Sequence, residues 1–242
     1  MSSRRSDPEE GHSNFRRMES RHVGKPQPHR KIVTGRRDCI TGEYPSGKQS
    51  MNYRQVAYEG RLARDFIVLI DNDPRVISYR EEPPPFPWFD GDKWRSYTPD
   101  FDCLLDDGKR QCHEIKPWKL RQRLHPRFKE GVGLGALEAG YDSFEIWTER
   151  EIDPLAVANA ALISSERGFS VADDELHTIR LAVDRANGPT SVADLRQRSG
   201  IGLRSFRAVV SLIARGELVQ LDPKAPLDDR AIVGIPTTMN AR

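Results

Sequence analysis

The sequence contains few cysteines and lacks any long apolar run. Three of its 242 residues are cysteine (Cys39, Cys103 and Cys112), an odd set without a Cys-x-x-Cys pair. The longest uninterrupted apolar run, residues 66–70, is far too short to cross a bilayer, and no charged segment leads into an apolar stretch at the N-terminus. These features argue against a disulfide scaffold and a membrane protein, and they predict free thiols in a reducing cytoplasm.

Cysteines can also serve as zinc ligands. Cys103 and Cys112 could face each other across a predicted hairpin, and His113 and His125 are near them in the sequence. These spacings match no common zinc pattern, so the sequence does not favour a structural zinc site.

Charged residues are nearly balanced in number but unevenly placed. The 38 Lys and Arg and the 36 Asp and Glu give a formal net charge of +2. Residues 1–37 hold ten Lys and Arg against four acids, and residues 115–129 hold six Lys and Arg and no acid. The first segment fits either a disordered polar tail or a DNA-binding arm. For the second, whose alternative is a solvated helix start, we favour DNA phosphate contacts through Lys119, Arg121 and Arg123.

A motif with chemical meaning lies between residues 97 and 116. A Pro99-Asp100 pair is followed, after thirteen intervening residues, by Glu114-Ile115-Lys116. Residues 101–105 predict a strand, Asp-Asp-Gly at 106–108 predicts a hairpin turn, and residues 111–116 predict the returning strand. Side chains alternate faces along a strand, so Glu114 and Lys116 are expected on one face and Ile115 on the other. Asp100, at the mouth of the first strand, is then expected near Glu114.

These three groups suit metal-dependent cleavage of phosphodiesters. Two carboxylates at that separation can hold a hard cation such as Mg²⁺ or Mn²⁺. A Lys ammonium beside them can orient or help to deprotonate a metal-bound water, or neutralise charge on the phosphate. This is the pattern of the PD-(D/E)xK nucleases; the alternative is an ordinary ion pair between Glu114 and Lys116 on a solvated strand.

A helix that starts at Glu59 is predicted upstream of the motif. Apolar residues at 58, 62, 66, 69 and 70 follow helical spacing, and Asp71-Asn72-Asp73-Pro74 is a stop signal before a strand at 76–79. A helix with one acid, then strands, then Asp and Glu-x-Lys on a hairpin is the order of elements in the restriction-endonuclease core. The alternative for Glu59 is an ordinary acid on a helix surface.

The rest of the chain divides into an arm, a continuation of the core and a C-terminal part. Residues 1–50 predict a loose arm, and the Pro-rich stretch 81–88 predicts an extended edge or loop. After the motif we expect a helix at 126–139, loosened by three glycines, a strand at 144–148, and a helix from Asp153-Pro154 to about 165. Gly168 marks the predicted boundary.

The C-terminal third predicts a small winged helix-turn-helix. A helix at 172–186 is expected to stop at Asn187-Gly188-Pro189, and Ser191 is an N-cap candidate for a helix at 192–198. After a tight turn, apolar residues 203, 206, 209, 210 and 213 predict a third helix, and a short strand at 216–221 follows. Arg204 and Arg207 are expected on one face of the third helix, where they can act on one phosphate or acidic patch. The module reads DNA or binds protein; the alternative is a plain helical cap.

Three segments of the chain resemble the endonuclease subunit (TnsA) of heteromeric cut-and-paste transposases. They are the run from Glu59 to Phe66, the run from Asp71 to Val76, and the spacing from Tyr97 to Pro117. The resemblance covers roughly residues 50 to 165. It implies an enzyme that nicks the 5′ strands at transposon ends, with an integrase-like partner transposase of the RNase H fold for the 3′ strands and a regulatory ATPase. It also implies a bacterial, nucleoid-associated location. The catalytic positions it implies are Glu59, Asp100, Glu114 and Lys116; some members have Gln where this chain has Glu114.

Together these patterns predict an α/β protein with a restriction-endonuclease-like core, a mixed sheet flanked by helices, and a C-terminal winged-helix domain. The expected divisions are an arm at 1–50, a nuclease domain at 51–168 and a winged-helix domain at 169–242. The expected function is Mg²⁺-dependent cleavage of double-stranded transposon-end DNA, with Asp100, Glu114 and Glu59 as metal ligands. Two alternatives are another nuclease of the superfamily, for restriction or junction resolution, and a non-catalytic DNA-binding assembly subunit.

Overall fold

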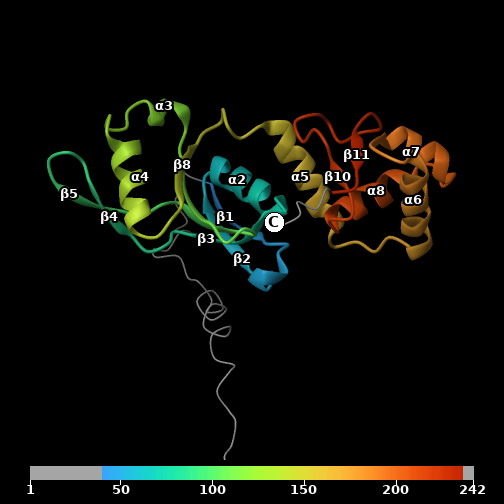
Figure 1. Cartoon of the computed structure of the whole chain (residues 1–242), viewed down its shortest axis with the longest axis horizontal. Helices are drawn as coiled ribbons and strands as arrows, with labels where there is room; N and C mark the ends of the chain where they lie inside the picture. Colours follow the sequence, from blue (N-terminus) through green and yellow to red (C-terminus); the bar gives the residue numbers. More distant parts are fainter. Residues whose placement is uncertain (1–39, 237–242) are drawn as a thin grey trace, which may run out of the picture.

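The structure, a computed structural model, describes residues 40–236. Within them the chain is a mixed α/β protein with seven α-helices and four small sheets, of which the largest has four strands. Figure 1 shows two parts side by side, a sheet-centred part and a mainly helical C-terminal part, with α5 between them. The predicted arm over residues 1–39, together with Cys39, lies outside the described residues.

The central sheet has the strand order β3-β6-β7-β8. Its strands are β3 (Val76–Glu81), β6 (Phe101–Leu105), β7 (Arg110–Ile115) and β8 (Ser143–Trp147). β6 runs antiparallel to both β3 and β7, and β8 runs parallel to β7. The predicted hairpin is confirmed: β6 pairs with β7, and the amide of Leu105 donates to the carbonyl of Lys109 across the turn at 2.9 Å.

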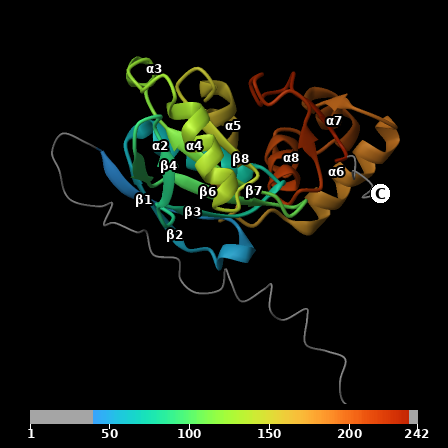
Figure 2. The ribbon, with the colours of Figure 1, turned by 60° about the vertical axis from the view of Figure 1, so that its left-hand side comes forward.

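One helix covers each face of this sheet. The two are α2 (Arg61–Asn72) and α4 (Phe128–Glu138), and Figure 2 shows α4 in front of the strands. α2 buries Phe66 and Ile67 in a core with β3 and β6, and α4 buries Val132 in a second core with β7 and β8. The order along the chain is therefore helix, three sheet strands, helix, strand, with a hairpin inserted between β3 and β6.

The inserted hairpin explains the glycines of α4. It consists of β4 (Phe86–Phe89) and β5 (Trp94–Tyr97), and it projects from the end of the molecule in Figure 1. A Cβ atom built at Gly135 would lie 2.5 Å from the Pro87 carbonyl oxygen, and one at Gly131 would lie 2.7 Å from that of Phe89. These two glycines therefore let α4 approach the backbone of β4 closely. This contact explains them better than the predicted loosening of the helix does.

The prediction of a loose arm to residue 50 is wrong from residue 41 onward. β1 (Thr41–Pro45) pairs antiparallel with β2 (Gln55–Glu59), and a short 3₁₀ helix, η1 (Gln49–Met51), lies between them. Composition predicted a loose segment here because it is polar, yet Tyr44 packs against the α2 core and Ser46 is buried, with its hydroxyl donating to Asp71 at 2.7 Å. Long-range packing outweighs the local bias.

Two helices follow β7 and β8. α3 (Trp118–Arg121) is a single turn immediately after Lys116 and Pro117, and α5 (Pro154–Glu166) follows β8. Asp153 caps α5 as its sequence predicted, because its side chain accepts from the amides of Leu155 and Ala156. α5 packs against both α2 and α8, so the division predicted at Gly168 follows a helix that is shared by the two parts.

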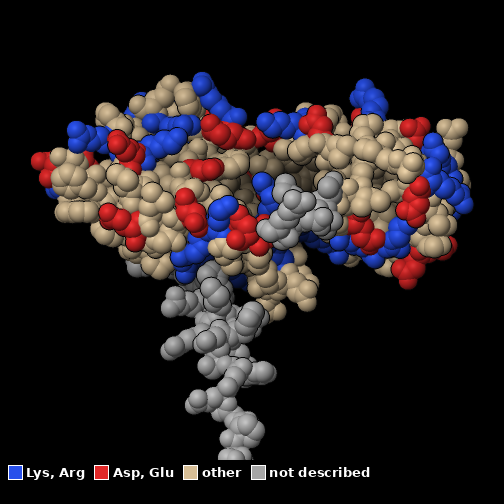
Figure 3. All heavy atoms as spheres, viewed as in Figure 1, with Lys and Arg blue, Asp and Glu red and all other residues tan. Residues whose placement is uncertain are grey.

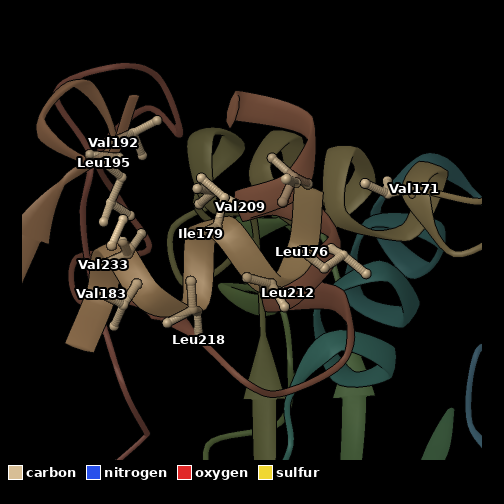
Figure 4. Close-up of a cluster of buried hydrophobic side chains, with 14 of the residues drawn as sticks. Val171, Leu176, Ile179, Val183, Val192, Leu195, Val209, Leu212, Leu218 and Val233 are labelled. Atoms are coloured by element: carbon tan, nitrogen blue, oxygen red, sulfur yellow. The ribbon is translucent and has the colours of Figure 1, made fainter. Parts of the chain in front are cut away.

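The C-terminal part contains three helices and a three-stranded sheet. The helices are α6 (Asp173–Ala186), α7 (Val192–Ser199) and α8 (Arg204–Ala214). The strands are β9 (Thr190–Ser191), β10 (Val219–Gln220) and β11 (Ile232–Gly234), in the order β10-β11-β9. Figure 4 shows their common core, in which Leu176, Ile179 and Leu195 are fully buried.

Most of the local signals in this part are confirmed. Ser191 caps α7 by accepting from the amide of Asp194, and Asn187 ends α6 in the left-handed conformation. Leu203 is an exception: it was predicted on the apolar stripe of the third helix, but it precedes that helix and is 82% exposed. Among residues 40–236, no helix is both long and apolar enough to cross a bilayer.

Candidate active site

Three carboxylates stand side by side where β3, β6 and β7 meet. Glu81 pairs with Phe101 and Phe101 with His113, and Glu82, Asp100 and Glu114 lie one residue beyond these last pairs, where the charges of Glu82 and Glu114 act on Asp100. Main-chain hydrogen bonds link these strand ends: the amide of Glu82 donates to the Asp100 carbonyl at 2.9 Å, and the amide of Asp100 donates to the His113 carbonyl, next to Glu114, at 3.0 Å. We call these three residues the carboxylate row.

Asp100 is fixed by the chain that follows Glu114. Its Oδ2 accepts a hydrogen bond of 2.6 Å from the main-chain N–H of Ile115. This carboxylate therefore takes the place of the next strand residue in the ladder between β6 and β7. The prediction that Asp100 lies near Glu114 is confirmed, and the reason is a backbone contact that alternation alone does not indicate.

Both oxygens of Glu114 are engaged. Lys116 Nζ contacts Oε1, and Tyr97 Oη donates to Oε2 at 2.6 Å. The expectation that Glu114 and Lys116 share a face is confirmed by this contact. Glu114 is buried, whereas the Lys116 side chain is 27% exposed, so the ammonium lies between the carboxylate and solvent.

The carboxylates of the row repel one another. Burial raises the pKa of Asp100 above its ordinary value, and the charges of Glu114 and Glu82 raise it further, against the opposing effects of the Ile115 amide and Lys116. Burial and the charge of Glu114 also hold the pKa of Tyr97 well above its ordinary range, so the hydroxyl stays protonated and donates. The site therefore has an excess of negative charge that a cation would relieve.

Glu82 is the functional candidate that sequence reasoning missed. It is buried, and its φ of 44° is positive, a conformation that non-glycine residues adopt rarely. The Pro-rich stretch that follows it concealed its place beside β3, since that stretch predicted only an edge or loop. Two successive acids before Pro83 were the available signal: Glu81 points to the opposite side of the sheet, where its carboxylate binds Arg54.

Glu59 is the last residue of β2. The prediction that it begins a helix is wrong, because Glu59 ends β2, opposite Thr41, and α2 begins at Arg61. Gly60, with a φ of 92°, separates the strand from the helix. β2 contacts β3 through the Glu81 side chain, which accepts from the amide of Ala57 at 3.3 Å. A catalytic role for Glu59 stays a prediction.

Cys103 and Cys112 do not face each other. Cys103 pairs with Gln111 and lies in the α2 core, whereas Cys112 pairs with Asp102 and lies in the α4 core, on the other face of the sheet. Burial lowers the pKa of His113 to about 4, so this ring is neutral within the α2 core. Between residues 40 and 236, no group of three or more His, Cys, Asp and Glu side chains could by itself hold a metal ion.

The basic stripe predicted after the motif occupies α3 and its surroundings. Lys119 and Arg123 are exposed, whereas Arg121 pairs with Glu151 at 3.2 Å and lies over the Trp118 ring. Figure 3 shows Lys and Arg side chains along this upper edge of the molecule. Because only Pro117 separates Lys116 from α3, the stripe begins beside the Lys116 end of the site.

Arg204 and Arg207 do not converge on one site. Both are exposed on α8, but Arg204 pairs with Glu175 of α6 at 2.7 Å, and Arg207 pairs with Glu166 of α5 at 2.8 Å. The Arg207 guanidinium also covers the Phe169 ring. Most other positions of α8 are buried against α5, α6 and α7. Exposed ion pairs are weak, so the two arginines can exchange partners, yet little else of α8 is available to a ligand.

Replacing Asp100 with asparagine is expected to stabilise the metal-free protein, and more at about pH 9 than at about pH 5. The raised pKa of Asp100 means that the protonated form stabilises the fold fully below the unfolded-state pKa. This contribution is lost as the pH rises through the raised value. Asparagine can keep the Ile115 hydrogen bond without the charge, so its advantage should grow by about 1.4 kcal/mol for each pH unit between the unfolded-state pKa of Asp100 and the raised native value. Urea unfolding in EDTA measures it; parallel pH curves for the two proteins would contradict it.

Comparison of the chain with protein-family models and with curated protein sequences finds no match to either.

Proposed function

We propose that this protein is a metal-dependent DNA endonuclease. The observation that supports the proposal most is the convergence of Asp100, Glu114 and Lys116 on one face at the end of the central strands. The order helix, three strands, helix, strand, with β8 parallel to β7, is what a restriction-endonuclease-like core would have. The exposed basic side chains around α3 supply a place for a phosphate backbone beside the carboxylates.

The residues present fit a divalent cation. Mg²⁺ needs only one or two protein carboxylates when water and substrate phosphates complete its shell, so the absence of a three-ligand group among the described residues agrees with Asp100 and Glu114 as the holders. Their mutual repulsion, increased by Glu82, favours a cation between them. When bound, such a cation would activate a water and stabilise negative charge on the scissile phosphate.

The chain's own groups would have distinct tasks. Asp100 is held by the Ile115 amide and would keep one ligand oxygen fixed, because main-chain geometry restrains it. Glu114 would supply the second carboxylate. Lys116, between Glu114 and solvent, would neutralise charge on the incoming phosphate or orient the attacking water.

We further propose, on the resemblance to the TnsA family, that the substrate is transposon-end DNA, cut on the 5′ strands together with an integrase-like transposase and a regulatory ATPase. The C-terminal part supports a winged-helix assignment, because three helices and the sheet order β10-β11-β9 are the arrangement such a module has. Since α8 is largely covered, protein contacts suit this module better than insertion of α8 into a DNA groove.

The decisive experiment is a nicking assay with Mg²⁺, labelled transposon-end DNA and the partner transposase. We expect 5′-strand cleavage that requires Mg²⁺ and disappears in Lys116→Ala. Cleavage of other DNA without the partner would favour a different nuclease of the superfamily. Absence of cleavage with intact DNA binding would leave a non-catalytic assembly subunit and refute the proposal.

The basic stripe is expected to add DNA affinity that depends on salt. Lys119→Ala with Arg123→Ala should weaken binding and flatten the salt dependence by about 0.9 for each phosphate contact removed, or about 1.8 for the pair. Arg121 should contribute less, because Glu151 already pairs with it. Fluorescence anisotropy at several salt concentrations gives both quantities.

A matched control is available at the other end of the sheet. Arg75→Ala with Lys109→Ala removes the same charge from exposed positions beside β3 and in the turn between β6 and β7. This control should leave the salt slope unchanged. If the two double variants flatten the slope equally, the contribution is general charge and the stripe has no special role.

A further inference from the structure

Tyr97 connects the inserted hairpin to the carboxylate row. It is the last residue of β5, and its hydroxyl donates to Glu114 Oε2 at 2.6 Å. Lys116, by contrast, reaches Glu114 Oε1 from the same strand continuation, two residues away. The second oxygen of Glu114 is therefore held only by a residue from outside the central sheet, among the contacts described for it.

The ring of Tyr97 is itself held on three sides. It makes edge-to-face contacts with Phe86 of β4, Phe128 of α4 and Phe144 of β8, with ring centroids 5.5, 5.4 and 5.8 Å away. Such contacts prefer definite orientations, so they restrict the ring and aim its hydroxyl. These three rings thus determine the position of the Tyr97 hydroxyl oxygen next to Glu114.

We propose that Tyr97 is a positioning residue of the candidate nuclease site, whose hydroxyl fixes the Glu114 carboxylate for the divalent cation and the substrate phosphate. This inference rests on the proposed nuclease function. It gives the inserted hairpin a function in the site. None of the four catalytic positions predicted from the sequence lies in that hairpin. A carboxylate restrained on both oxygens cannot rotate freely, and a fixed carboxylate spares the reorganisation that a mobile one requires.

The test uses Tyr97→Phe, which keeps the ring and removes the hydroxyl. We expect kcat for DNA cleavage to fall by about tenfold or more, with KM for DNA changed less than about twofold, because the hydroxyl bonds to Glu114 and not to a side chain of the basic stripe. Isothermal titration calorimetry without DNA should show Mg²⁺ affinity weakened by about tenfold. A hydroxyl that only supports packing would lower the melting temperature without this separation of kcat from KM.

Tyr141→Phe is the matched control. Tyr141 also packs against Phe86, and its hydroxyl lies 3.4 Å from Asp102, a carboxylate outside the row. This variant should keep both kcat and Mg²⁺ affinity. In a Glu114→Gln background, Tyr97→Phe should no longer change Mg²⁺ affinity, because the carboxylate it positions is gone.

The outcomes separate this inference from the function on which it rests. A parent protein that binds DNA but never cleaves it would overturn the nuclease proposal itself. A parent that cleaves while Tyr97→Phe matches it in kcat and Mg²⁺ affinity would overturn the role of Tyr97 and leave the function standing. Equal losses in Tyr97→Phe and Tyr141→Phe would likewise reduce Tyr97 to a packing residue.

Discussion

Asp100→Ala is expected to reduce Mg²⁺-dependent DNA cleavage by at least about a thousandfold. A metal ion supplies several kcal/mol of transition-state stabilisation, and each 1.4 kcal/mol corresponds to about tenfold in rate. Asp100 is the carboxylate that the Ile115 amide holds in place at 2.6 Å, so no flexible neighbour can substitute for it at the same position. Single-turnover cleavage with the partner transposase present measures the loss directly.

Asp107→Ala is the control for this change, because Asp107 is an exposed acid in the turn between β6 and β7. It should cleave as the parent does. The Asp100→Ala protein should keep its circular dichroism spectrum, and Asp100→Asn, which keeps an acceptor for the Ile115 amide, should melt no lower in EDTA than the parent, since a repelled carboxylate is removed. Parent-like cleavage by a folded Asp100→Ala protein would sink the assignment of the site.

Arg167→Ala is expected to lower the free energy of unfolding by about 3 kcal/mol, since it leaves a buried carboxylate without its cation. The partner is Asp71 in the last turn of α2, whose side chain is fully buried and binds Arg167 Nη1 at 2.5 Å. Ser46 Oγ and Tyr79 Oη also donate to Asp71, at 2.7 and 2.9 Å. Arg167 is 25% exposed, which moderates the effect. Urea unfolding near neutral pH measures it.

The pH dependence provides an independent check on this pair. Burial by itself would raise the pKa of Asp71, but the hydrogen bonds from Ser46, Gly47 and Arg167 outweigh it and lower the pKa overall. The stability that ionised Asp71 contributes is therefore present above about pH 4 and is lost as the pH falls through the lowered value. Arg167→Ala should move this loss to higher pH.

A double variant tests whether the stability lost in Arg167→Ala comes from the unpaired charge of Asp71 or from the missing Arg167 side chain. Asp71→Asn with Arg167→Met removes both charges and should recover part of the stability lost in Arg167→Ala, because no unpaired charge stays buried. If the double variant is as unstable as the sum of its single changes, the two residues act independently. In that case the contact between α2 and the end of α5 depends on packing alone.

The sequence by itself determined the local elements. The alternation at 101–116 and the Asp-Asp-Gly turn predict β6, β7 and the shared face of Glu114 and Lys116, because strand geometry has a period of two. The caps at Asp153 and Ser191 likewise predict where α5 and α7 begin, since a cap needs only the next three residues. The hairpin also predicts that Asp100 lies near Glu114, although the Ile115 amide that holds the Asp100 carboxylate could not be predicted from it.

Only the tertiary structure decided which distant residues join these local elements. Glu82 enters the carboxylate row through the register between β3 and β6, and Tyr97 reaches Glu114 because α4 and β8 orient its ring. Glu59 leaves the predicted helix because β1, from a segment whose composition predicted a loose arm, pairs with β2. Sheet register and helix packing depend on contacts across tens of residues, and a local pattern contains no information about them until the layers close.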